Sequence, residues 1–199
     1  MSDKLIALDT QLFLWLNSQH SPFWDKVMWL VSGKIEWLPL YLILVAFIIY
    51  RYRWQSLAII VSIIIAVALA DHLAVKAFKE VFERLRPSHN PEIQDLVHIV
   101  NNYRGGLYGF VSNHAANSFS LAMFLSLLLK NKLFTAGIFF WAILVSYSRI
   151  YLGVHYPGDI LGGAALGMVI GWLAYSAYKT AYPYIGKLIR TQKNSRKSN

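Results

Sequence analysis

Long apolar stretches alternate with short polar ones along most of the chain, and this spacing predicts membrane-spanning helices. A spanning helix needs about 20 mostly apolar residues. Five stretches approach that length, and a sixth at residues 23–32 is interrupted by Asp25 and Lys26. The five are residues 37–50, 54–70, 115–129, 133–147 and 158–178. The pattern therefore predicts an all-α, polytopic transmembrane helix bundle of five or six spans.

The first residues of the chain follow a different pattern. Residues 5–16 repeat apolar positions at helical spacing around Asp9 and Gln11. A helix with one apolar and one polar face lies in the interface plane of a bilayer. We therefore expect an N-terminal interfacial helix ahead of the bundle.

Lysine and arginine gather at alternate ends of the expected spans. One set consists of Arg51, Arg53, Lys130, Lys132, Lys187, Arg190, Lys193, Arg196 and Lys197. In membrane proteins the short cytoplasmic loops carry the excess of basic residues. These ends are therefore predicted to be cytoplasmic, and the opposite ends, at residues 79–113 and 149–157, are predicted to face outward.

Composition agrees with a membrane protein and excludes several other classes. Of the 199 residues 56% are apolar, above the roughly 45–50% of soluble domains. The net charge of +9 does not indicate nucleic acid as a partner, because the basic residues fall in short runs at the span ends. The absence of cysteine excludes a thiol nucleophile and a cysteine-ligated metal.

The length of the chain suits a single domain. We expect one membrane-embedded domain over residues 1–185, followed by a basic cytoplasmic tail over residues 186–199 that is disordered from Arg190 onward. The sequence leaves the oligomeric state open.

Three polar motifs lie at the predicted outward ends, and the first contains Lys79 and Arg86. If the helix continued between them, both cations would lie on one side of it. Arginine binds phosphate oxygens with a planar fork and lysine supplies a point charge, although both could also be ordinary interfacial cations. We expect Arg84 to pair with Glu83 or with solvent, and Asp71 to support Lys79.

The second motif is Ser112-Asn113-His114, directly before the apolar stretch 115–129. Serine and asparagine are favourable N-cap residues. A helix N-terminus also presents free N–H groups and the positive end of the helix dipole to an anion. The motif is therefore a helix cap, an anion site from which His114 delivers a proton, or both.

The third motif contains Arg149, His155 and Asp159. Pro157 suits the first turn of the last helix, which places His155 just before that helix and Asp159 within its first turn. The carboxylate can then bond one imidazole nitrogen and leave the other free as a nucleophile. The glycines at positions 158, 162, 163, 167 and 171 are interpreted as helix-packing positions.

The ordered pattern Lys-x6-Arg-Pro, Ser-x-His and Ser-Arg-x5-His-x3-Asp resembles the type-2 phosphatidic acid phosphatase superfamily over residues 55–180. That family includes bacterial phosphatidylglycerophosphate, undecaprenyl-diphosphate and lipid A phosphatases, and it is related to vanadium haloperoxidases. One position departs from the family, whose middle motif usually reads Pro-Ser-Gly-His. Here it reads Val111-Ser112-Asn113-His114, and we expect the Asn113 side chain to narrow the pocket or to bond the phosphate.

The resemblance implies roles for individual residues. His155 would attack phosphorus to give a phosphohistidine, Asp159 would orient His155, and His114 would protonate the leaving group and then activate water. No metal or other cofactor is implied, since cations take the electrostatic role. The residues implied to bind the phosphate are Lys79, Arg86, Ser112, Asn113 and Arg149.

The expected function is a metal-independent lipid phosphate phosphatase in the bacterial cytoplasmic (inner) membrane, with its active site facing the periplasm. Its expected partners are the substrate lipid and the bilayer. An isoprenyl (undecaprenyl) diphosphate or a phosphatidylglycerophosphate-type lipid is the favoured substrate, and lipid A is the alternative.

Two other hypotheses are a non-catalytic lipid-binding or transport protein and a vanadate-dependent peroxidase. The presence of His114, His155 and Asp159 argues against the first. The membrane setting and the small size argue against the second.

Overall fold

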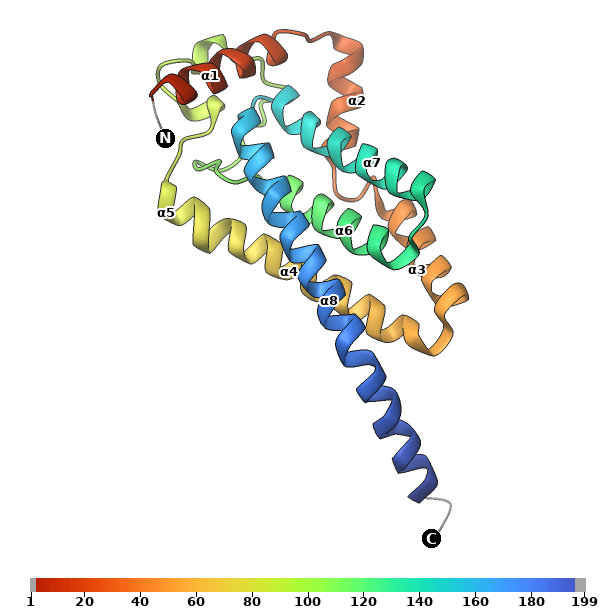
Figure 1. Cartoon of the computed structure of the whole chain (residues 1–199). Coiled ribbons are helices and arrows are strands. Elements are labelled where there is room, and N and C mark those ends of the chain that lie inside the picture. Colours follow the sequence, from red (N-terminus) through yellow and green to blue (C-terminus); the bar gives the residue numbers. More distant parts are fainter. Residues whose placement is uncertain (1–2, 196–199) are drawn as a thin grey trace.

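The computed structural model describes residues 3–195, and the side chains of residues 3–182. The described part is helical apart from its loops and one isolated bridge between Leu85 and Tyr108, which confirms the all-α class (Figure 1). The longer helices are α1 (Asp3–Asn17), α2 (Pro22–Ser32), α3 (Leu38–Tyr52), α4 (Ser56–Leu73), α6 (Asn113–Leu129), α7 (Lys132–Tyr151) and α8 (Pro157–Ser195). The short elements are η1 (Arg53–Gln55), the π-helical η2 (Ala74–Lys79), α5 (Glu80–Phe82), η3 (Pro87–His89) and η4 (Gln94–Leu96).

Within residues 3–182, three stretches have the length and apolar composition of a membrane span. They are Leu38–Phe82, Lys132–Tyr151 and Pro157–Tyr182. This number is below the expected five or six because only η1 separates α3 from α4, so both fall in one stretch, and because α6 has 17 residues. The span considered at residues 23–32 is wrong, since α2 with its 11 residues is about 16 Å long and cannot cross a bilayer.

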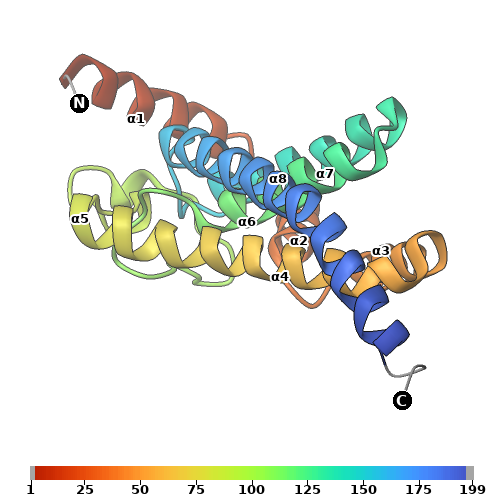
Figure 2. The ribbon, with the colours of Figure 1, turned by 60° about the horizontal axis from the view of Figure 1, so that its bottom comes forward.

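Helix α6 is the central helix of the bundle. It contacts α4, α7 and α8 and packs most extensively against α8, which crosses over it in Figure 2. A Cβ atom at Gly163 would lie 2.5 Å from the carbonyl oxygen of Ser112, and one at Gly167 would collide with the backbone of Ala116. Gly163 and Gly167 therefore let the two backbones touch, which confirms the interpretation as packing positions for these two glycines.

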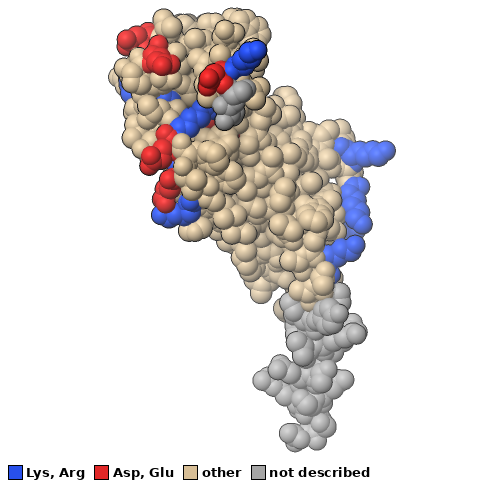
Figure 3. Space-filling view, turned by 60° about the vertical axis from the view of Figure 1, so that its left-hand side comes forward, with Lys and Arg blue, Asp and Glu red and all other residues tan. Residues whose placement is uncertain are grey.

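The basic turns between the helices lie together at one end of the bundle. The hydroxyl of Tyr52 donates a hydrogen bond to the carbonyl oxygen of Leu128 at 3.3 Å, so the α3–α4 and α6–α7 turns are neighbours. Figure 3 shows charged side chains toward the two ends and a middle band with almost none. Large apolar side chains are exposed on the helices, including Ile43, Ile64 and Phe140. This is the surface of a bundle that is embedded in a membrane.

The two ends of the chain differ in how closely they follow the sequence-based expectation. Helix α1 forms where we expected a helix and lies across the end of the bundle (Figure 1). Its buried Asn17 ties it to the end of α7, because the side-chain amide donates to the carbonyl oxygen of Tyr151 at 2.8 Å. Helix α8 continues to Ser195, so the expectation of disorder from Arg190 onward is wrong for residues 190–195. Residues 196–199 lie outside the described part.

Candidate active site

The helix that carries Lys79 ends before Arg86, the second residue of the first motif. The helix ends at Phe82, and Glu83 adopts a left-handed conformation with φ of 46°. Residues 84–86 then pair with residues 107–109 through two backbone hydrogen bonds. The amide of Arg86 donates to the carbonyl oxygen of Leu107 at 3.0 Å, and the amide of Gly109 donates to the carbonyl oxygen of Arg84 at 2.8 Å. The condition for placing Lys79 and Arg86 on one side of a single helix is therefore not met, because the helix ends between them. In the extended segment the side chains of Arg84 and Arg86 share one face.

Arg86 is almost fully buried, with 8% of its surface exposed. Its Nε donates to the carbonyl of Tyr108 at 3.1 Å and its Nη1 to that of Val154 at 3.4 Å. Burial, with Arg149 nearby, lowers the pKa of Arg86 to about 10, so the guanidinium keeps its charge at neutral pH. The neighbouring loop is shaped around it, because a Cβ atom at Gly105, which has φ of +68°, would lie 2.6 Å from Nη1.

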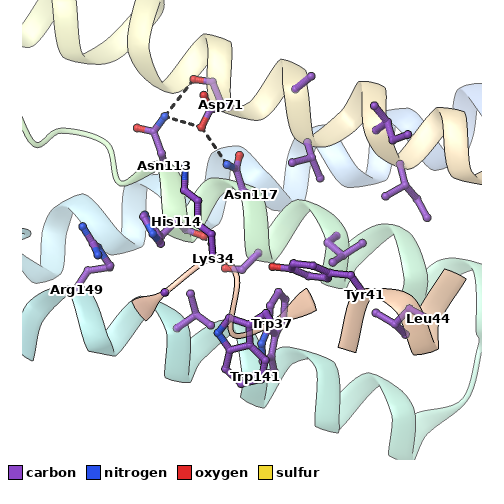
Figure 4. A pocket seen from close by; sticks show the side chains of 18 of the residues that line it. Lys34, Trp37, Tyr41, Leu44, Asp71, Asn113, His114, Asn117, Trp141 and Arg149 are labelled. Carbon is purple, nitrogen blue, oxygen red and sulfur yellow. Dashed lines mark hydrogen bonds between the residues drawn. The ribbon is translucent and has the colours of Figure 1, made fainter. Parts of the chain in front are cut away.

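Lys79 reaches the site through Asn113, the residue that departs from the family motif. The ammonium of Lys79 donates a hydrogen bond to Asn113 Oδ1. The amide nitrogen of Asn113 donates to Asp71 Oδ1 at 2.8 Å, and Asn117 donates to the same oxygen at 3.0 Å (Figure 4). Asp71 therefore acts on Lys79 by fixing the Asn113 amide, rather than by pairing with the lysine directly.

The second motif caps α6. Ser112 is the N-cap, and its buried Oγ accepts a hydrogen bond from the amide of Ala115 at 3.5 Å. The amide of Ser112 donates to the carbonyl oxygen of Asp159 at 3.0 Å, which ties the start of α6 to the first turn of α8. His114, in the first turn of α6, is brought to the same cavity as Lys79 and Arg149.

Arg149 lies in the last turn of α7 and is buried inside the protein, with 3% of its surface exposed. One terminal nitrogen donates to the hydroxyl of Ser32 and the other to the hydroxyl of Tyr103 at 3.0 Å. Its Nε is buried and has no hydrogen-bond partner among the described residues. A buried guanidinium nitrogen without a partner is costly, and an anion bound in the cavity would satisfy it.

His155 and Asp159 form a buried pair, with 1% and 0% of their surfaces exposed. Nδ1 of His155 lies 3.2 Å from Asp159 Oδ2, which also accepts from the amide of Tyr156 at 3.0 Å. A carboxylate facing Nδ1 favours the tautomer that carries its proton there and leaves Nε2 with a lone pair. Burial, together with the cations Arg86, Arg149 and Lys79, holds the pKa of His155 well below its ordinary value. The imidazole is therefore neutral and able to attack.

The sequence did not indicate the positions of two further cations near the site, Arg84 and Lys34. Arg84 does not pair with Glu83 or with solvent; it binds Asp159 and Asp9 instead, at 3.0 and 2.8 Å. Lys34 lines the cavity and has no hydrogen bond or ion pair with a side chain in residues 3–182. Because Arg84 and Arg86 are two residues apart, a prediction of an extended segment would have placed both side chains on the same face of it.

A cavity of about 860 Å³ joins the polar site to an apolar trough between the helices (Figure 4). Its size is that of a small-molecule site, roughly 300–1,000 Å³. Its polar end is lined by Lys79, Arg86, Asn113, His114, Arg149 and His155. Its apolar walls include Leu44, Ile48, Ile60, Ile63, Leu121 and Leu125. One ligand with a charged head and an apolar tail would fill both parts.

The sequence profile of the PAP2 superfamily matches residues 55–183, well over half of the chain. The chain belongs to the PAP2 superfamily. It is similar to the lipid A 4'-phosphatase of Bacteroides thetaiotaomicron, with 44% identity over 88% of this chain and 79% of the relative. The lipid A 4'-phosphatase of Porphyromonas gingivalis is 38% identical over 88% and 75%. The phosphatidylglycerophosphatase B of Bacillus subtilis is 34% identical over 68% and 64%.

Solved structures share the fold of this PAP2 protein. The crystal structure of LpxE from Aquifex aeolicus matches with a TM-score of 0.64 and 24% identity, over 85% of this chain and 95% of that one. A transmembrane PAP2-type phosphatidylglycerolphosphate phosphatase from Bacillus subtilis matches with a TM-score of 0.67 and 24% identity, over 90% and 88%. The PAP2 protein is an integral membrane lipid phosphate phosphatase with helical spans.

Within residues 3–182 of the PAP2 phosphatase, no group of three or more histidine, aspartate or glutamate side chains is arranged to hold a metal ion. The groups that come together at the polar end of the cavity include the motif cations Lys79, Arg86 and Arg149 and the histidines His114 and His155. This set can neutralise a phosphate, attack it and exchange protons with it.

Proposed function

We propose that this PAP2 phosphatase removes the 4'-phosphate from a lipid A-type glycolipid. The observation that carries the proposal is the pair of relatives at 44% and 38% identity, both lipid A 4'-phosphatases and both aligned over 88% of this chain. They support lipid A, which was the alternative substrate in the sequence analysis. They do so over the isoprenyl diphosphate and phosphatidylglycerophosphate-type lipids that were favoured there.

The reaction begins with the phosphate held between the three cations. Lys79, Arg86 and Arg149 bind its oxygens at the polar end of the cavity and neutralise charge as it shifts during transfer. The amide groups at the start of α6 add hydrogen bonds from a helix N-terminus. In this account Ser112 caps that helix and Asn113 holds Lys79, so both act on the phosphate through other groups.

His155 then attacks phosphorus through Nε2. The nitrogen–phosphorus bond forms as the bond from phosphorus to the ester oxygen breaks, and His114 donates a proton to that oxygen so that the lipid leaves as an alcohol. Asp159 keeps the proton on Nδ1 of His155 and stabilises the imidazolium. Water, deprotonated by His114, attacks the phosphohistidine, which releases inorganic phosphate and restores both histidines.

The lipid tail occupies the apolar trough. The walls formed by α3, α4, α6 and α7 continue directly from the catalytic residues, so a phosphate next to His155 places the attached acyl chains along them. The positive-inside distribution supports a site on the outer, periplasmic side, because the basic turns lie at the opposite end of the bundle.

The experiment is phosphate release by the purified protein in detergent from lipid A bisphosphate, undecaprenyl diphosphate and phosphatidylglycerophosphate. Mass spectrometric fragmentation of the lipid A product shows which sugar loses its phosphate. We expect lipid A to be the preferred substrate and its 4' position to be dephosphorylated. A markedly higher kcat/KM for either other lipid, or loss of the other phosphate of lipid A, would contradict the proposal.

A further inference from the structure

Arg84 lies between two carboxylates that come from opposite ends of the sequence. One terminal nitrogen donates to Asp159 Oδ1 at 3.0 Å and the other to Asp9 Oδ2 at 2.8 Å. The Asp159 side chain is fully buried, and those of Arg84 and Asp9 are 19% and 10% exposed. Charges removed from water are stable only when they are paired, so the three groups depend on one another.

The second oxygen of Asp9 is bound by α8. The amide of Gly158, in the first turn of that helix, donates to Asp9 Oδ1 at 2.7 Å, where the helix dipole also favours a carboxylate. A Cβ atom at position 158 would lie 2.7 Å from Asp9 Oδ2, so a glycine is needed for this approach. Asp9 thereby fixes α1 to the turn that carries Asp159 (Figure 1).

Tyr156 holds the Arg84 guanidinium from a third direction. The guanidinium carbon lies 4.0 Å from the centre of the Tyr156 ring, a cation–π contact. The Tyr156 hydroxyl also has a partner, since it accepts a hydrogen bond from the side-chain amide nitrogen (Nδ2) of Asn90 at 3.1 Å. Arg84 is therefore held in one orientation toward Asp159.

Asp159 needs this cation to orient the histidine. Its Oδ2 accepts hydrogen bonds from Nδ1 of His155 and from the backbone amide of Tyr156. Among the described side chains, Arg84 is the one that binds its Oδ1. A buried carboxylate without a cation tends to take up a proton. A protonated Asp159 would donate to Nδ1 of His155, the histidine proton would move to Nε2, and the lone pair needed for attack would be lost.

We infer that Arg84 and Asp9 are positioning residues of the reaction, which keep Asp159 ionised and aimed at His155 and make the N-terminal helix α1 part of the catalytic apparatus. The inference rests on the proposed role of His155 as the nucleophile. It assigns a function to α1, whose sequence indicated only contact with the membrane interface.

The test uses the full chain purified in detergent, with lipid A bisphosphate as substrate. It compares kcat and KM, the pH dependence of the rate, the melting temperature and the tautomer of His155 from nitrogen NMR of histidine-labelled protein. The variants are Arg84→Met, Arg84→Lys, Asp9→Asn and His155→Ala, with Arg51→Met as the matched control. Arg51, at the far end of α3, loses the same charge without touching the site.

We expect Arg84→Met to lower kcat about 100-fold, as a misaligned catalytic group does, with little change in KM. The acid limb of its pH profile moves to higher pH, and the His155 signal shifts toward the tautomer protonated at Nε2. Arg84→Lys restores part of kcat. Asp9→Asn keeps an acceptor for Gly158 and causes a smaller loss, because the bond to Arg84 is no longer between two charges. Arg51→Met matches the wild type.

An Arg84→Met protein with wild-type kcat and an unchanged His155 tautomer would overturn the inference. So would a lower melting temperature with a normal pH profile, which indicates a structural role alone. If Arg84→Met does not fold, Asp9→Asn and Arg84→Lys decide by the same readouts. An active His155→Ala protein would instead refute the nucleophile assignment, so the two failures are distinguishable.

Discussion

Replacing Gly163 by alanine tests whether the contact between α6 and α8 sets the geometry of the active site. The new methyl carbon would lie 2.5 Å from the carbonyl oxygen of Ser112, a separation that real Cβ atoms essentially never show. Because the obstacle is backbone, the start of α6 has to retreat from α8 by roughly half an ångström or more before contact is tolerable.

The magnitude follows from what that retreat separates. Overpacking of a close contact costs about 1–3 kcal/mol, only partly offset by the roughly 0.5–1 kcal/mol that alanine gains over glycine in a helix. The hydrogen bond from Ser112 to the carbonyl of Asp159, 3.0 Å long, lengthens at the same time. His114 then moves away from His155, and a misplacement of about 1 Å can lower a rate 100-fold. We expect kcat/KM to fall by about 10- to 100-fold.

The assay pairs phosphate release from a lipid phosphate with thermal unfolding, both in detergent. Gly137→Ala is the matched control, because position 137 is exposed on α7 and its Cβ would meet nothing within 4 Å. That variant should be fully active and equally or more stable. If Gly163→Ala also keeps its melting temperature and its kcat/KM, the contact between α6 and α8 does not position the site as we argue.

Two further predictions concern the charges of the site. Asn113→Gly removes the acceptor that holds Lys79, so we expect kcat/KM to fall about tenfold, the effect of one hydrogen bond to a charged group. Asn117 lines the same cavity and donates to Asp71 rather than to Lys79, so Asn117→Ala should have a smaller effect, and equal losses would contradict the assigned role of Asn113. The lowered pKa of His155 means that its imidazole stays neutral at pH 6.5 and takes up a proton only in more acidic solution. Nitrogen NMR of histidine-labelled protein measures this directly, with the His155→Ala spectrum as the assignment control, and a titration midpoint at or above 6.5 would contradict the electrostatic account.

Local patterns in the sequence were enough to predict the parts of the site that local structure determines. The N-cap at Ser112 and the start of α8 at Pro157 are set by neighbouring residues. The approach of Asp159 to His155 follows from their spacing at a helix start. Packing of the last helix was also predictable, because small residues at regular spacing have one common use in membranes.

Interactions between distant segments account for what the sequence did not predict. The break after Phe82 depends on pairing with residues 107–109, which hydropathy cannot indicate. Arg84 looked like a surface charge because both of its partners lie 75 residues away in the sequence. The sequence analysis favoured other lipids than the relatives at 44% and 38% identity support, because all the candidate lipids present a phosphate to the same cations. The motif residues do not distinguish what the phosphate is attached to.

The central claim is that His155 carries the phosphate between substrate and water. Rapid mixing of the protein with lipid A labelled in its phosphate groups, followed by an alkaline quench that preserves phosphohistidine, captures that species, and mass spectrometry locates it. We predict label on His155 during the first turnover, and neither label nor phosphate release in His155→Ala. Phosphate release without label on a histidine, or label on another residue, would contradict the account.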